Sequence, residues 1–199
     1  THPRATAVAA GIRSEPGLSE WHVYPLIPYV NKYVRGANEK GLVNLVMDTL
    51  GQASAGQKLR MVVQGARGLL GKDFRQAMSL LIDMELTPFR RVPLGGVFLH
   101  DVLTDLLLGL GLESVLELFR AHVTGYYGAP VGLVTKNFPL LRERLDRIGW
   151  SAPLIMASFN RTGFFMNPSV DRCAEAIRRP GCQLVAMNTL AGGHLRPDT

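Results

Sequence analysis

Several polar residues of this chain stand directly after short apolar stretches. His100 and Asp101 follow Gly-Val-Phe-Leu, and Lys136 follows Val-Gly-Leu-Val-Thr. A histidine exchanges protons near neutral pH, a carboxylate can orient it, and a desolvated lysine amine can attack a carbonyl carbon. These residue types predict acid–base or carbonyl chemistry, with His100, Asp101 and Lys136 as candidate catalytic residues. The alternatives are a histidine hydrogen-bonded inside the fold and a lysine that extends to solvent.

Two further apolar stretches end in the same way. Asn160 and Arg161 follow Leu-Ile-Met-Ala-Ser-Phe, and Asn188 follows Gln-Leu-Val-Ala-Met. An arginine guanidinium can hold a carboxylate or phosphate through two parallel hydrogen bonds. Asn160 and Arg161 are therefore candidate substrate-binding residues, the alternative for Arg161 being a solvated loop side chain.

The apolar stretches alternate with segments of helical periodicity, which predicts repeated β-α units. Strands are expected at 59–63, 96–100, 131–135, 154–159 and 183–187. Helices are expected at 31–50, 74–86, 112–127, 138–148 and 170–179. Residues 1–20 are expected to form a loose N-terminal arm, and residues 21–199 a single domain.

Alternation of strands and helices requires parallel strands with helices packed on the sheet, in an open doubly wound sheet or a (β/α)8 TIM barrel. The Gly-x-Gly-x-x-Gly motif of a dinucleotide-binding domain is absent, since Gly65, Gly68 and Gly71 have a different spacing. Polar residues at several strand ends favour the barrel, whose active site is assembled there. A barrel usually needs about 250 residues. The 199 residues therefore predict an incomplete or truncated barrel, with open edges that a partner or a second copy would cover.

Composition excludes several classes of protein. The 22 Lys and Arg exceed the 16 Asp and Glu, but they are scattered, so no nucleic-acid partner is expected. A hydrophobic content of 47% excludes a disordered chain, and two cysteines exclude a disulfide scaffold or a four-ligand zinc site. No apolar run predicts a membrane span, no metal is expected, and a reducing cytoplasmic location is the default.

Four of the strand ends resemble the aldo-keto reductases, among them Pro153 to Asn160, which is similar to the sixth strand of that family. Val131-Gly-Leu-Val-Thr-Lys-Asn-Phe is similar to the fifth β-α unit of that family, and Val185-Ala-Met-Asn-Thr-Leu-Ala-Gly-Gly to its seventh strand and following turn. Gly96-Val-Phe-Leu-His100 is similar to the fourth strand, which ends in the active-site histidine of the family. The resemblance covers roughly residues 59–196 and implies a TIM barrel.

The resemblance also implies a nicotinamide cofactor, NADP, with Asn137, Asn188 and Met187 as its contacts. Most of the catalytic tetrad is not matched. Gln64 stands in place of the family's lysine, and Asp48 lacks the tyrosine expected a few residues later.

The sequence therefore leaves three functions open. The first is a divergent reductase-like oxidoreductase that acts on a small carbonyl metabolite. The second is a class I aldolase-like lyase that forms a Schiff base with its substrate at Lys136. The third is a barrel without catalytic activity, serving as a scaffold or binding protein.

Overall fold

The computed structural model describes residues 3–18, 20–28, 72–90 and 92–197. The expected helix at 31–50 and strand at 59–63 lie outside these residues, as do Asp48 and Gln64. The chain forms two compact units. The first contains Thr1–Gly95 and Leu118–Gly128, and the second contains Gly96–Glu117 and Ala129–Thr199.

The first unit contains mostly helices among its described residues. Its elements are α1 (Pro3–Ser14), β1 (Leu26–Ile27), α5 (Lys72–Leu86), the 3-10 turn η1 (Thr87–Phe89), the end of α7 (Glu113–His122) and the π-helical turn η2 (Val123–Tyr127). The helix predicted at 74–86 is confirmed by α5. Within the predicted N-terminal arm, residues 3–14 form the helix α1.

The second unit contains the strands whose ends carry the candidate residues. Its elements are β2 (Val97–Leu99), α6 (Asp101–Leu110), the start of α7, β3 (Val131–Thr135), α8 (Phe138–Arg147), β4 (Leu154–Ser158), α9 (Val170–Arg178), β5 (Gln183–Met187) and the 3-10 turn η3 (Ala191–Gly193). The four strands predicted in this region are confirmed. The sequence pattern missed α6, which starts immediately after His100.

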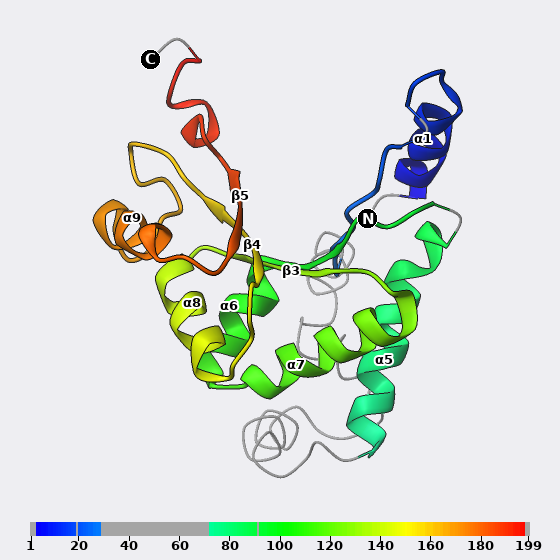
Figure 1. The fold of residues 1–199 in the computed structure, drawn as a ribbon, viewed down its shortest axis with the longest axis horizontal. Helices are drawn as coiled ribbons and strands as arrows, with labels where there is room; N and C mark the ends of the chain where they lie inside the picture. The colour runs from blue at the N-terminus through cyan, green and yellow to red at the C-terminus, as the bar shows by residue number, and fades with distance from the viewer. Residues whose placement is uncertain (1–2, 19, 29–71, 91, 198–199) are drawn as a thin grey trace, which may run out of the picture. The chain divides into compact units, whose positions relative to one another are not determined.

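Strands β2 to β5 pair in parallel and in chain order. Right-handed crossovers between consecutive parallel strands place the connecting helices on one face of a sheet. Figure 1 shows α6, α8 and α9 along one side of this sheet, with α6 against β3 and α8 against α9. The chain is therefore of the α/β class. Among the described residues the sheet is open, because β5 pairs with β4 alone.

The two faces of the sheet are packed differently. Thr135 hydrogen-bonds to α6, so Thr135 and Leu133 point toward the helices, and both side chains are fully buried. On the other face the ring of Phe98 covers Gly132, its register partner on β3. This face opens toward β5, where Val185 is 38% exposed.

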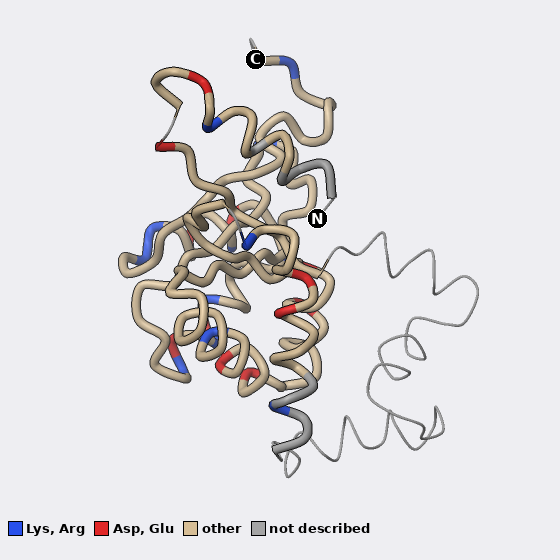
Figure 2. The backbone as a smooth tube through the Cα atoms, turned by 90° about the vertical axis from the view of Figure 1, so that its right-hand side faces the viewer, with Lys and Arg blue, Asp and Glu red and all other residues tan. Residues whose placement is uncertain are grey.

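The charged residues are spread over the described chain. Figure 2 shows basic and acidic positions interspersed along the tube, without a long segment of one sign. In the described ranges we find no helix with the length and apolar character needed to cross a membrane.

The contact between Phe98 and Gly132 predicts that a methyl group at position 132 destabilises the folded chain. A Cβ atom there would lie 2.2 Å from Cε1 of Phe98, which is itself buried. We expect Gly132→Ala to lower the free energy of unfolding, measured in urea, by about 1–3 kcal/mol. Gly109→Ala is the control, because a Cβ in this exposed turn of α6 meets nothing within 4 Å. It should raise stability by up to about 1 kcal/mol. Equal effects of the two substitutions would contradict the packing described.

Candidate functional site

His100 connects β2 to α6 and is held in place at both its backbone and its ring. Its backbone is extended, as is usual for an N-cap residue, and its carbonyl accepts a hydrogen bond from the Thr104 hydroxyl at 3.2 Å. Nδ1 lies 2.5 Å from Oδ1 of Asp101. The amide of Val102 lies 2.9 Å from the same oxygen and 3.3 Å from Nδ1, so the shorter contact assigns this amide to Asp101. We therefore assign the ring proton to Nδ1, donating to Asp101, which leaves Nε2 to exchange protons.

Lys136 reaches the same carboxylate from the end of β3. Its Nζ lies 3.2 Å from Oδ2 of Asp101 and 4.8 Å from the centroid of the Phe165 ring. The side chains of His100, Asp101 and Lys136 are 24%, 13% and 37% exposed, so this group is open to small molecules. The structure thus brings together the three residues that the sequence predicts to be catalytic.

Asp105, one turn along α6 from Asp101, fixes the end of β3. Its Oδ1 accepts from the Thr135 hydroxyl at 2.5 Å, and its Oδ2 accepts from the amide of Lys136 at 3.0 Å. The Thr135 hydroxyl in turn accepts from the amide of Asn137 at 2.8 Å. Asp105 therefore positions the backbone of Lys136.

Burial shifts the pKa values of two groups at this site. Burial lowers the pKa of His100 below its usual value, and the ammonium of Lys136 lowers it further, against the opposing effect of Asp101. His100 is therefore neutral at pH 7. Burial raises the pKa of Asp105, and the carboxylate of Asp101 adds to the rise. The hydrogen bonds from Thr135 and from the amide of Lys136 oppose that rise.

Asn160, predicted to bind substrate, organises the loop between β4 and α9. Its Oδ1 accepts from the amide of Phe164 at 2.9 Å and from the Thr162 hydroxyl at 3.0 Å. Its Nδ2 donates to the carbonyls of Phe164 at 2.9 Å and Asn188 at 3.2 Å. Four hydrogen bonds within the chain thus occupy this amide. Arg161, the next residue, is exposed.

The three predicted cofactor contacts each make a hydrogen bond within the chain, Asn137 and Asn188 through the side chain and Met187 through its backbone. Asn137 caps α8, its Oδ1 accepting from the amide of Leu140 at 3.2 Å. Nδ2 of Asn188 donates to the Ser158 hydroxyl at 2.8 Å. The carbonyl of Met187 accepts from the amide of Phe159 at 3.0 Å.

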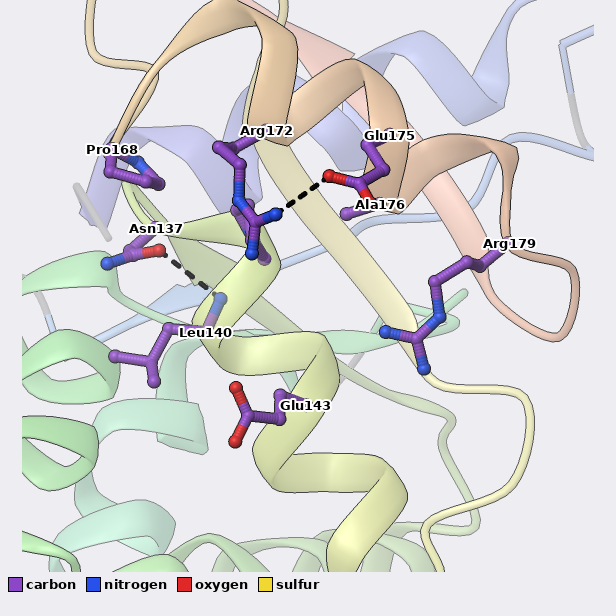
Figure 3. A pocket seen from close by; sticks show the side chains of 9 residues that line it. Asn137, Leu140, Glu143, Pro168, Arg172, Glu175, Ala176 and Arg179 are labelled. Carbon is purple, nitrogen blue, oxygen red and sulfur yellow. Dashed lines mark hydrogen bonds and ion pairs between the residues drawn. The ribbon is translucent and has the colours of Figure 1, made fainter.

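Asn137 also lines a groove of about 290 Å³ between α8 and α9. Figure 3 shows Arg172 and Glu175 on α9 joined by an ion pair of 2.9 Å, with Glu143 on α8 below them. Arg179 completes a charge-balanced set of two arginines and two glutamates. The groove belongs to the helix layer, whereas the cluster of His100 lies where β2 and β3 end.

Comparisons of the chain with protein-family models, with characterised proteins and with solved structures give no match. The resemblance to aldo-keto reductases therefore stays a prediction from the sequence.

The NADP cofactor that the resemblance implies likewise stays a prediction from the sequence. Hydrogen bonds within the chain use the Oδ1 of Asn137, which caps α8, and the Nδ2 of Asn188, which donates to Ser158. Within the described ranges, no group of three or more His, Cys, Asp or Glu side chains is placed to hold a metal ion.

A second polar cluster lies in the first unit and was missed by the sequence analysis. Oδ1 of Asp83 on α5 accepts from Nε2 of His122 at 2.8 Å and from the Tyr127 hydroxyl at 2.7 Å. Burial would raise the pKa of Asp83, but these two hydrogen bonds lower it overall. Burial and the bond to Asp83 raise the pKa of Tyr127, so the phenol stays protonated. The cluster ties α5 to the π-helical turn.

The lowered pKa of His100 predicts a pH dependence of stability. The unfolded chain binds a proton at His100 near pH 6.5, whereas the folded chain binds it only at lower pH. The contribution of His100 to the free energy of unfolding is therefore complete above about pH 6.5. It is lost as the pH falls through this value toward the lower pKa of the folded chain. We expect the free energy of unfolding, measured in urea, to fall less between pH 7 and pH 5 for His100→Gln than for the wild type. The control His194→Gln, at an exposed histidine, should follow the wild type. Identical pH profiles for the wild type and His100→Gln would contradict the lowered pKa of His100.

Proposed function

We propose that the edge of the sheet at His100 and Lys136 is the active site of an enzyme that acts on a small carbonyl compound with an anionic group. The observation that carries the proposal is the contact of both residues with one carboxylate, at 2.5 Å and 3.2 Å from Asp101. This arrangement places a neutral base and a cation side by side at a partly exposed position. Active sites of α/β proteins occur at this end of parallel strands.

The chemistry that suits this pair is proton transfer at the carbon next to a carbonyl. Nε2 of His100 takes the proton from that carbon, and the electron pair of the broken C–H bond moves to the carbonyl oxygen. The ammonium of Lys136 stabilises the resulting negative oxygen, and Asp101 stabilises the imidazolium that forms. Return of the proton from Nε2 to carbon, or to oxygen, completes the step and restores the neutral histidine.

The closed (β/α)8 barrel is part of the same proposal. Strands β2 to β5 follow one another in chain order without reversal, as in a barrel, and the helices cover one face. A doubly wound sheet has a point where the strand order reverses, and the sheet of this unit has none among its described strands.

A reductase-like reaction with NADP stays a prediction that rests on the resemblance alone. Hydrogen bonds within the chain already use Oδ1 of Asn137 and Nδ2 of Asn188, two of the atoms expected to contact the nicotinamide. The proton transfer proposed above uses only the side chains of His100, Asp101 and Lys136.

The position of Lys136 at the end of β3 also suits a Schiff base, but its nitrogen already has two partners. A carboxylate lies at 3.2 Å and the centroid of an aromatic ring at 4.8 Å, and both interact favourably with a cation. We therefore assign Lys136 an electrostatic role.

The proton-transfer step predicts exchange of hydrogen for deuterium. Incubated in D2O with a panel of small 2-oxo acids, the protein should speed exchange next to the carbonyl of at least one of them, as measured by proton NMR. His100→Gln should slow the catalysed exchange about 10²–10⁴-fold, the usual contribution of a general base. His194→Gln should leave it unchanged. Exchange no faster than in buffer across the panel would instead support a barrel without catalytic activity.

The electrostatic role of Lys136 predicts that borohydride traps no adduct. After incubation with the same 2-oxo acids and sodium borohydride, the intact mass should stay that of the unmodified chain, because an electrostatic role forms no covalent bond between Lys136 and the substrate. Lys136→Met should still lower the rate of exchange, since the cation is lost. A mass increase that maps to Lys136 would establish the lyase chemistry in place of the proposed role.

A further inference from the structure

Phe165 lies beside the proposed active site, and both its exposure and its backbone conformation are unusual for a phenylalanine. Its side chain is 47% exposed, and its backbone has a φ of 56°, a left-handed conformation that bulky side chains rarely adopt. Its ring centroid lies 4.8 Å from Nζ of Lys136. An exposed aromatic side chain held in a strained conformation points to a functional constraint rather than to packing.

The loop that carries Phe165 is firmly anchored. Asn160 binds it through its amide, and the amide of Asn167 donates to the carbonyl of Lys136 at 2.9 Å. Met166, the next residue after Phe165, is 4% exposed. Because the residues on both sides are fixed, the ring is held near the ammonium group.

The neighbouring ring has a different role. Phe164 packs toward η3, where a Cβ atom on Gly192 would lie 3.2 Å from its Cζ, and its centroid lies 5.8 Å from that of His194. The centroids of Phe164 and Phe165 are 4.2 Å apart. The ring of Phe164 therefore packs against that of Phe165. The remaining surface of the Phe165 ring is exposed to solvent.

We propose that Phe165 selects aromatic substrates, so that the site takes 2-oxo acids with an aryl side chain. The inference rests on the proposed function, in which the ammonium of Lys136 faces the carbonyl oxygen of the substrate and Nε2 of His100 faces the carbon next to the carbonyl. An aryl ring one or two bonds away would then lie against the exposed part of Phe165. Offset or edge-to-face contact of two aromatic rings is favourable beyond the area it buries.

One carboxylate, that of Asp101, contacts the ammonium of Lys136, whereas Asp105 binds its backbone amide. Asp101 also accepts from Nδ1 of His100, so this carboxylate is shared between two groups. The negative oxygen that forms on the substrate is therefore a second partner for the lysine.

The test compares the binding of three probes by calorimetry at pH 7: pyruvate, 4-methyl-2-oxopentanoate and phenylpyruvate. For the wild type we expect phenylpyruvate to bind about tenfold more tightly than pyruvate, with the branched aliphatic acid between them. Phe165→Ala should bring the Kd of phenylpyruvate to within about twofold of that of pyruvate in the same variant. Phe165→Leu should retain binding of the aliphatic acid and lose the aromatic preference. Phe159→Ala, which removes another exposed ring of the same loop, is the matched control and should change neither Kd.

The possible outcomes separate this inference from the proposed function. Equal binding of pyruvate and phenylpyruvate, or an unchanged preference in Phe165→Ala, would overturn the inference alone. Binding that does not depend on Lys136, measured with Lys136→Met, would overturn the proposed function as well. Circular dichroism of each variant establishes that it is folded.

Discussion

The partly buried carboxylate of Asp105 is the constraint on which the candidate site depends. It accepts hydrogen bonds from the side chain of Thr135 and from the main chain of Lys136, so α6 holds the last residues of β3 in one position. Partial burial raises the pKa of this carboxyl group, and the charge of Asp101 adds to the rise. Burying such a group is costly unless it is hydrogen-bonded, and these contacts offset part of the cost. The result is a fixed starting point for the side chain of Lys136.

The same short helix places the second carboxylate. Asp101 lies in the first turn of α6, where the helix dipole favours a negative charge, and its two oxygens face His100 and Lys136. One residue thus orients a base and stabilises a cation. Because the neutral histidine and the ammonium are adjacent and partly exposed, the arrangement suits a substrate that develops negative charge on oxygen.

A large part of this could be predicted from the sequence, for identifiable reasons. Alternating apolar runs and amphipathic segments located β2 to β5, α8 and α9, because a parallel sheet covered by helices requires that pattern. The rule that polar residues at strand ends meet at one edge found the cluster of His100. The helix α6 was missed because its run of leucines lacks a clear polar face next to a strand of similar composition. The roles of Asp105 and Asn160 were missed because their partners, up to 31 residues away, are decided by packing.

The sequence by itself determined the alternation of strands and helices and the chemical types at the strand ends. Both follow from local periodicity and from residue identity, which do not depend on distant contacts. Only the tertiary structure decided which of these polar groups are available to bind or react with a substrate. It paired His100 and Lys136 through Asp101, and it used the amides of Asn160 and Asn188 in bonds within the chain. The reason is that a buried polar group must find a partner, and the folded chain supplies that partner from elements far apart in sequence.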